Sequence, residues 1–363
     1  MGSLVYPTKQ GLYDPLFEKD ACGVGFVCHT QGHPSRQIIE DGLTLLKNMK
    51  HRGAVGADKD TGDGAGMMVK IPHSFFKSQL SKQGATLPEA GDYAVGMIFL
   101  PREPHLRLYC EGVFERILRE EDLGFAVWRE VPVNEAQCGK WARATRPVIS
   151  QVFVQKGKYS TQKFREKLYL VRKRVQAILN EKPDTGYFYV CSLSDQTLLY
   201  KGQILGIRLD QFYVDLQHPL FKSSFTIVHE RYSTNTFPSW KLAHPFRYIA
   251  HNGEINTIRG NVNRMNAREG VLTSERYGDD FEKLLPIIEK GSSDSASLDN
   301  LFELFYIHQL PIEQILMIMM PENWQANDQL SPEVRAFYEY YARIFEPWDG
   351  PAAIILSDGE KIA

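Results

Sequence analysis

Cys22 is the residue whose surroundings most clearly invite chemistry in this 363-residue sequence. It follows a partly charged leader and opens the alternating apolar stretch "CGVGFVCH" at residues 22–29. A cysteine thiolate is a strong nucleophile, but it needs a nearby base or a lowered pKa. If the chain were cut before Cys22, its new α-amino group, with a pKa of about 8, could accept the thiol proton. The position therefore fits either a buried structural cysteine or a nucleophile that becomes the N-terminus.

Two further motifs carry polar groups at the ends of apolar stretches. Asn252 and Gly253 end "YIAHNG", and their side-chain amide and backbone N–H are adjacent donors. An oxyanion hole requires two such donors, although an Asn-Gly pair is often only a turn. Arg231 ends the apolar part of "TIVHER", where a guanidinium can clamp a carboxylate with two hydrogen bonds or form a surface ion pair.

Asp294 lies in "GSSDSASLDN", just before an apolar helical run. Asp and Ser both serve as helix N-caps, and taken alone an N-cap is the preferred interpretation of Asp294. A helix start also presents free backbone N–H groups, so a structural role and a binding role are compatible there.

The elements that position these residues are predicted from hydrophobic periodicity. Strands are expected over 24–29, 67–71, 93–100, 124–133, 149–155, 225–234 and 245–253, and hairpins over 187–202 and 352–363. Helices are expected over 36–52, with Ser35 as N-cap and Gly53 past the end, over 104–120 and 161–179, and through most of 254–346. Strands and helices that do not strictly alternate indicate an α+β fold with large sheets.

Composition excludes several classes of protein. Apolar residues make up 43% of the chain, which suffices for a large core, and a net charge of −2 gives no general affinity for nucleic acid or membranes. The five cysteines are odd in number and lack CxxC spacing, which argues against a disulfide framework or structural zinc. The first thirty residues do not form a signal peptide. We expect a cytoplasmic protein.

Two motifs are interpreted structurally. "TGDGAG" at 61–66 superficially resembles a dinucleotide fingerprint, but it follows a predicted helix and precedes a strand, the reverse of the required order. It is interpreted as a tight loop that needs positive φ angles and could shape a pocket wall. His229, His244 and His251 lack a metal-ligand spacing and are interpreted as structural histidines.

Five motifs in this order, "CGVGF", "HRGAVGA", "HERYSTN", "AHNGEIN" and "GSSDS", resemble the class II glutamine amidotransferase domain of the N-terminal nucleophile hydrolases. "TGDGAG", "RYSTNTFPSW", "HNGEINTIRGN" and "EPWDGP" are similar to the glutaminase domain of the glutamate synthase large subunit. The resemblance covers residues 22–363 and implies a four-layer αββα sandwich. It also implies that residues 1–21 are a propeptide, whose removal makes Cys22 the N-terminus.

The resemblance implies a reaction. Cys22 would attack the side-chain amide of glutamine and release ammonia, and water would resolve the thioester to glutamate. Asn252 and Gly253 would hold the oxyanion.

It also implies how the substrate binds. Arg231 would bind the α-carboxylate of glutamine and Asp294 its α-ammonium. Thr234 and Arg52 are implied to line the pocket.

In that family the ammonia passes to synthase domains of the same full-length chain, which carry FMN and an iron–sulfur cluster. An NADPH-type large subunit with a small flavoprotein subunit is the favoured form, and no cofactor or metal is expected within these residues. The family's domain continues beyond the point that corresponds to Ala363, so a C-terminally truncated domain is expected.

Two alternatives remain open on the sequence. Another class II amidotransferase is disfavoured by the long middle segment and "TNTFPSW". A non-catalytic regulatory or assembly module of the same fold would keep the leader attached and use Cys22 as a core thiol.

Overall fold

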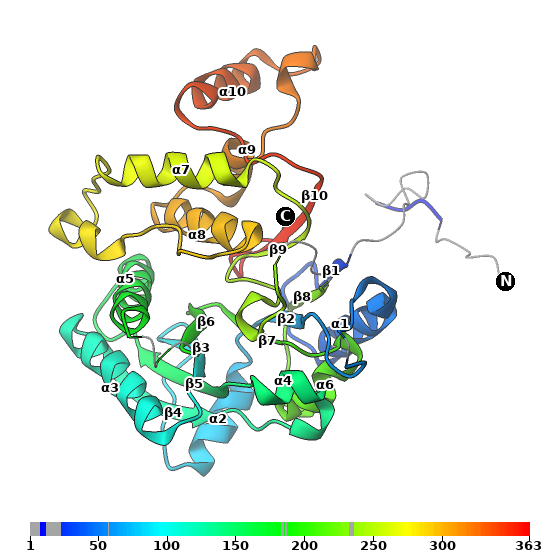
Figure 1. Cartoon of the computed structure of the whole chain (residues 1–363), viewed down its shortest axis with the longest axis vertical. Coiled ribbons are helices and arrows are strands. Elements are labelled where there is room, and N and C mark those ends of the chain that lie inside the picture. Colours follow the sequence, from blue (N-terminus) through cyan, green and yellow to red (C-terminus); the bar gives the residue numbers. More distant parts are fainter. Residues whose placement is uncertain (1–7, 12–22, 57, 183–184, 186, 232–235) are drawn as a thin grey trace.

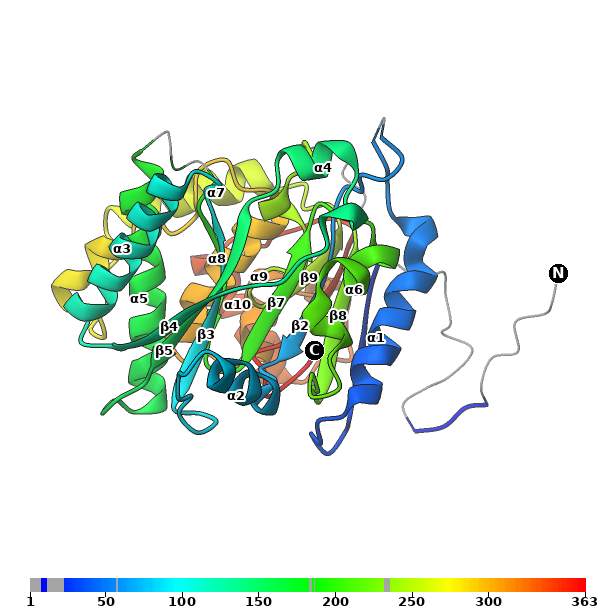
Figure 2. The ribbon, with the colours of Figure 1, turned by 90° about the horizontal axis from the view of Figure 1, so that it is seen from below.

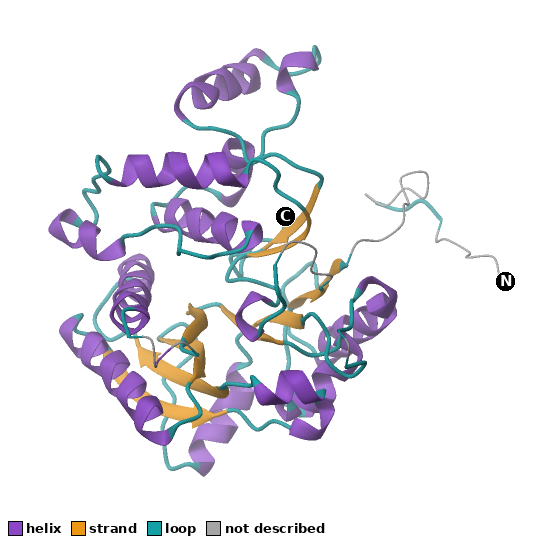
Figure 3. Cartoon of the chain, viewed as in Figure 1, coloured by secondary structure: helices purple, strands orange, loops and turns teal. Residues whose placement is uncertain are grey.

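The structure is a computed structural model that describes residues 8–11, 23–56, 58–182, 185, 187–231 and 236–363. It is a mixed α+β fold with antiparallel sheets, as predicted (Figures 1 and 3). The described residues form a four-stranded sheet of order β1-β8-β2-β7, a second of order β4-β5-β3-β6, and the pair β10-β9. No helix in this part of the chain is long and apolar enough to cross a membrane.

The strand bounds agree with most of the periodicity. The first sheet contains β1 (Val24–Cys28), β8 (Phe225–Glu230), β2 (Ala65–Lys70) and β7 (Thr197–Gly202). The second contains β4 (Gly124–Glu130), β5 (Val148–Gln155), β3 (Tyr93–Leu100) and β6 (Tyr189–Ser194). The pair is β9 (Ile249–Gly253) with β10 (Ala352–Leu356). After β10 the chain turns, and Ser357 bridges to Ile362, as expected of the final hairpin.

Helix starts follow the capping residues. The helices are α1 (Arg36–Asn48), α2 (His73–Lys82), α3 (Pro104–Glu120), α4 (Lys140–Ala144), α5 (Thr161–Asn180), α6 (Leu209–Phe212), α7 (Ile258–Glu269), α8 (Asp294–Ile307), α9 (Ile312–Met319) and α10 (Pro332–Ile344). Ser35 caps α1 as predicted, because its side chain accepts a hydrogen bond from the N–H of Ile38. Ser160 and Ser331 cap α5 and α10 in the same way.

The first sheet is one of four stacked layers (Figures 1 and 2). Helix α1 covers one face with Ile39 and Leu43. On the opposite face Met68 and Ile227 pack against Ala250 of β9, so the β10-β9 pair forms the next layer. Helix α8 lies beyond it and shares a core with Ile249 and Leu356.

The second sheet extends the molecule sideways. Helices α3 and α5 cover one of its faces, and the other face shares a core with the first sheet and α2 (Figure 2). The predicted hairpin over 187–202 is wrong in one respect: β6 pairs with β3 and β7 pairs with β2. The bend at Asp195 and Gln196 therefore carries the chain from one sheet to the other, and Arg165 holds it with hydrogen bonds of 2.9 and 3.0 Å to Asp195.

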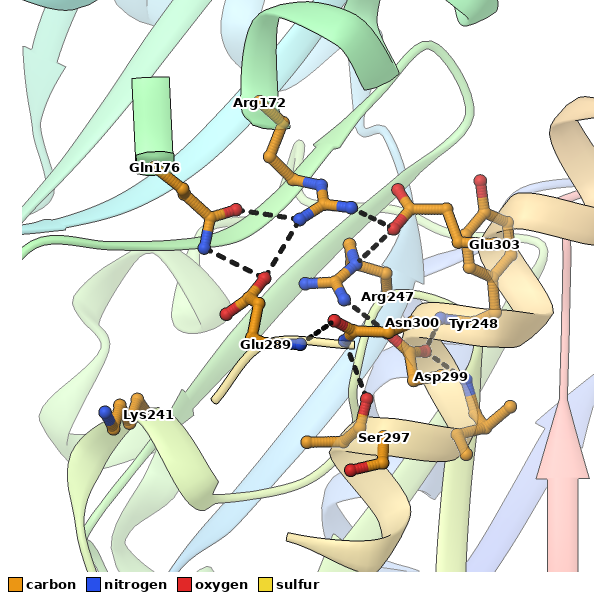
Figure 4. Close-up of polar contacts among 12 residues, drawn as sticks. Arg172, Gln176, Lys241, Arg247, Tyr248, Glu289, Ser297, Asp299, Asn300 and Glu303 are labelled. Atoms are coloured by element: carbon orange, nitrogen blue, oxygen red, sulfur yellow. Dashed lines mark hydrogen bonds and ion pairs between the residues drawn. The ribbon is translucent and has the colours of Figure 1, made fainter. Parts of the chain in front are cut away.

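A buried charge network joins α8 to the start of β9 (Figure 4). The guanidinium of Arg247 forms an ion pair with Asp299 at 3.0 Å and donates to Glu303 at 2.9 Å. The other oxygen of Asp299 accepts the backbone N–H groups of Tyr248 and Ile249, at 2.8 and 3.4 Å. Arg172 of α5 also bonds to Glu303. The network thus fixes β9 against α8 and α5.

Glu230, the last residue of β8, is buried beneath the start of β1. Its backbone N–H donates to the carbonyl of Gly23 at 2.8 Å. Its carboxyl occupies space that only glycines leave open: a Cβ on Gly53 would lie 2.3 Å from one oxygen, and a Cβ on Gly206 1.8 Å from the other. Burial raises the pKa of Glu230 to about 8. The carboxyl is therefore largely protonated in the folded chain at neutral pH.

Replacing Arg247 by methionine should destabilise the protein by about 3–5 kcal/mol, because buried Asp299 would lose its ion-pair partner and buried Glu303 would keep only Arg172. Chemical denaturation of the variant measures this loss. The control is Arg116→Met, which removes an exposed pair with Glu120 and should cost at most about 1 kcal/mol. Equal losses in the two variants would contradict the structural role of the network.

The contribution of Glu230 to stability should fall as the pH rises from about 4.5 to about 8, because the folded chain keeps the Glu230 proton that the unfolded chain releases. One such group contributes a slope of up to about 1.4 kcal/mol per pH unit. Glu230→Gln should remove this contribution. The free energy of unfolding of the variant, relative to that of the wild type, should therefore increase as the pH rises across that window. Urea unfolding at several pH values measures the difference. The control is Glu275→Gln at an exposed position, whose free energy of unfolding should change with pH in the same way as that of the wild type. The same pH dependence for Glu230→Gln would contradict the prediction.

Candidate active site

A cavity of about 410 Å³ lies where the ends of β8 and β9 meet the start of α8. Four residues singled out in the sequence line it, namely Arg231, Asn252, Gly253 and Asp294. The rest of the lining is His229, Thr236, His244, His251, Glu254, Ile255, Asn256, Ile258, Ser292, Ser293 and Ser295. Cavities that hold small ligands measure roughly 300–1,000 Å³. The volume is therefore suited to a small polar molecule.

Arg231 follows β8 and supplies the cationic part of the cavity. It is 6% exposed, and its Nη2 donates to Thr236 Oγ1 at 2.7 Å. Its Nη1 is buried without a hydrogen-bond partner among the described residues. Burial lowers the pKa of Arg231, while Asp63 and Asp294 act in the opposite direction. A buried guanidinium with an unused donor beside a cavity is suited to binding an anion.

The glycine-rich loop supports the backbone of Arg231, but none of residues 61–66 lines the cavity, so it does not form the pocket wall that the sequence suggested. The carbonyl of Gly64 accepts the backbone N–H of Arg231 at 2.8 Å. Gly64 has a φ of +144°, and a Cβ there would lie 2.9 Å from the Cβ of Ala243. Glycine is therefore required both for the backbone conformation and for the close approach.

Asn252 and Gly253 end β9 at the cavity. Gly253 has a φ of +123°, and a Cβ there would lie 1.9 Å from the carbonyl oxygen of Pro351. The side chain of Asn252 is close to Gly23, since its Oδ1 is 3.0 Å from where a Cβ on Gly23 would stand. The side-chain amide of Asn252 is thus placed beside the residue that follows Cys22.

Asp294 is not the N-cap of α8, and that interpretation is wrong. Ser293 is the cap, and its Oγ accepts the N–H of Ala296 at 3.2 Å. One carboxylate oxygen of Asp294 accepts the N–H of Ser295 at 2.7 Å, and the other accepts the N–H of Ile255 at 3.1 Å. Because Ser293 takes the capping role, the Asp294 carboxylate is left to face the cavity with its negative charge.

The three histidines are buried, as expected of structural histidines, but they also line the cavity, which their spacing did not indicate. The rings of His229 and His244 stack with centroids 4.3 Å apart. Burial lowers the pKa of His229 to about 3 and that of His244 well below its usual range. The described residues contain no group of three or more His, Cys, Asp or Glu suited to holding a metal ion.

Three predicted site residues need separate mention. Cys22 and Thr234 lie outside the described residues. Arg52 does not line the cavity, although its Cβ is 3.7 Å from where a Cβ on Gly23 would stand. Thr236 was missed by the sequence analysis because no periodicity marks a hydroxyl five residues after an arginine.

A larger cavity, of about 620 Å³, lies between α5, residues 285–292 and the start of α8. Two polar residues in its lining, Gln176 and Glu289, are already bonded to each other and to Arg172 (Figure 4). None of the predicted site residues lines it. The smaller cavity is therefore the candidate active site.

Comparison with known proteins identifies the family of the chain. The family model described as "Glutamine amidotransferases class-II" matches residues 22–363. Glutamate synthase [NADPH] large chain of Bacillus subtilis is 44% identical over 98% of this chain and 23% of its own length. Glutamate synthase [NADH] of Schizosaccharomyces pombe is 42% identical over 97% of this chain and 17% of its own length. Ferredoxin-dependent glutamate synthase 1 of Arabidopsis thaliana is 42% identical over 99% of this chain and 22% of its own length. The chain thus spans about a fifth of the length of these relatives, and it belongs to the class II glutamine amidotransferases.

Proposed function

We propose that the chain hydrolyses glutamine to glutamate and ammonia, with Cys22 as an N-terminal nucleophile. The observation that carries this proposal is convergence: Arg231, Asn252–Gly253 and Asp294 come from three separate segments and line one cavity. The Asn252 side chain in that cavity lies next to Gly23, the residue after Cys22. A cation, an anion and an oxyanion donor pair match the carboxylate, ammonium and amide of glutamine.

The chemistry follows from these groups. The Cys22 α-amine accepts the thiol proton, and the sulfur attacks the glutamine amide carbon. The side chain of Asn252 and the N–H of Gly253 stabilise the tetrahedral oxyanion. The oxyanion collapses and the C–N bond breaks as the protonated Cys22 amine gives its proton to the leaving amide nitrogen, which departs as ammonia. Water then hydrolyses the thioester and releases glutamate.

Substrate binding is assigned to the charged residues. Arg231 binds the α-carboxylate through Nη1, which has no partner among the described residues, and Asp294 binds the α-ammonium. Thr234 is assigned to substrate binding on family resemblance alone, and so is Arg52, although Arg52 does not line the cavity. The stacked layers α1, first sheet, β10-β9 and α8 support the αββα sandwich of N-terminal nucleophile hydrolases, and residues 1–21 are then a propeptide that is removed.

The larger context is inferred from the relatives. Glutamate synthases that use NADH, NADPH and ferredoxin are all about equally similar to this chain. Ammonia would pass to synthase domains of the full-length cytoplasmic protein. We favour the NADPH type, because a relative named a large chain implies a small subunit, here taken to be a flavoprotein. FMN and an iron–sulfur cluster are assigned to those other domains, since the described residues offer no metal-ligand group and the cysteines no cluster motif.

Labelling with a glutamine-like diazoketone tests the nucleophile. Intact mass should show a species that lacks residues 1–21 and carries one adduct. Cys22→Ser should abolish the adduct. Cys28→Ser is the matched control, because Cys28 is a free, exposed thiol six residues away, and this variant should still be labelled. A chain that keeps its leader and takes no adduct, or takes it on Cys28, would favour the non-catalytic module.

Kinetics should separate the two classes of residue. Asn252→Ala should lower kcat about a hundredfold or more, because one oxyanion donor is lost. Arg231→Lys should mainly raise KM, since a lysine cannot reproduce the forked hydrogen bonds. Steady-state glutaminase assays measure both constants, and a pure KM effect of Asn252→Ala would contradict the oxyanion role.

A further inference from the structure

The peptide groups of His251, directly before Asn252, are bound by imidazole side chains. Among the described residues β9 has β10 as its only partner strand, and His251 stands opposite Ile354 of β10. On the other edge, the N–H of His251 donates to Nδ1 of His244 at 3.3 Å. Its carbonyl oxygen accepts from Nε2 of His229 at 3.0 Å. Two side chains thus satisfy backbone groups that a further strand would otherwise bind.

These contacts fix the tautomer of each ring. His244 must leave Nδ1 unprotonated to accept, and His229 must carry its proton on Nε2 to donate to a carbonyl. Both rings must be neutral to stack face to face with centroids 4.3 Å apart beside Arg231. Burial lowers both imidazole pKa values and so favours this neutral state.

The two rings are held by the centre of the first sheet. His229 lies on β8 and is paired on both sides, with Val24 of β1 and Gly66 of β2. Gly66 lets the segment that carries His244 approach, because a Cβ on Gly66 would lie 2.3 Å from the His244 carbonyl oxygen. The position of His251 is therefore set by the rigid sheet layer below β9 and not by β10 alone.

The direction of the next peptide groups follows from strand geometry. Backbone polar groups alternate sides along an antiparallel strand, so those of Asn252 face β10 and the N–H of Gly253 faces the same edge as that of His251. This edge carries His229 and His244, which line the cavity with Gly253. A shift of the His251 peptide would therefore move both oxyanion donors.

We propose that His229 and His244 form a histidine clamp, a pair of positioning residues that hold the His251 peptide so that Asn252 and Gly253 meet the oxyanion. The proposal rests on the proposed function and deepens it, because it assigns the geometry of the oxyanion donors to two residues whose ring nitrogens bind the backbone of His251. Misplacement of reacting groups by about 1 Å can cost about a hundredfold in rate.

The variants separate hydrogen bonding from space filling. His229→Gln keeps an N–H donor near the place of Nε2, and His244→Asn keeps an acceptor near the place of Nδ1. His229→Leu and His244→Leu remove these groups. The control is His308→Leu, which removes a hydrogen-bonded imidazole at the far end of α8, outside the cavity.

In the 363-residue chain, each leucine variant of the clamp should lower the glutaminase kcat about tenfold to a hundredfold and leave KM within about threefold of the wild type. The amide variants should recover most of the loss. Hydrogen exchange of the peptide that contains residues 250–253 should accelerate in the leucine variants and stay slow in the amide variants. Circular dichroism confirms that each variant is folded.

Two outcomes would overturn the clamp. One is an equal kcat in the leucine and the amide variants, with a loss of kcat no larger than in His308→Leu. The other is unchanged hydrogen exchange at residues 250–253 in the leucine variants. If the wild type neither hydrolyses glutamine nor takes an adduct on Cys22, the proposed function fails instead, and the exchange data alone then decide whether the clamp holds the peptide.

Discussion

The ion pairing of Arg247 with Asp299 and Glu303 is the interaction on which the site depends. Arg247 lies two residues before β9, and the two carboxylates that it binds stand on successive turns of α8. Asp299 also accepts the first two N–H groups at the start of β9. Since Asn252 and Gly253 end this strand and Asp294 begins this helix, one buried network sets the distance between the proposed oxyanion donors and the proposed ammonium ligand.

Close backbone approach is the second constraint. Gly64 and Gly253 combine positive φ angles with contacts that leave no room for a Cβ. Gly53 and Gly206 make space for the buried carboxyl of Glu230 under the start of β1. These glycines thus let backbone segments at the cavity and beneath β1 pack at close distance.

Local signals predicted the elements well where they were strong. The helix over 104–120 and the strand over 93–100 have the predicted bounds, because periodicity and flanking turns agree there. The hairpin over 187–202 failed because a two-residue bend between two apolar strands does not reveal which neighbours they pair with. The pairing is decided by β2 and β3, which lie about a hundred residues earlier in the chain.

The sequence by itself determined the α+β class, the order of the motifs and the residue types that could bind and hydrolyse an amide. The residue types in the short motifs show which functional groups the chain has available. Only the tertiary structure decided that Arg231, Asn252, Gly253 and Asp294 line one cavity, that Arg52 stands outside it, and that Ser293 and not Asp294 caps α8. It alone revealed that two stacked histidines bind the backbone of His251. These facts depend on contacts between segments far apart in the chain, which hydrophobic periodicity and spacing do not encode.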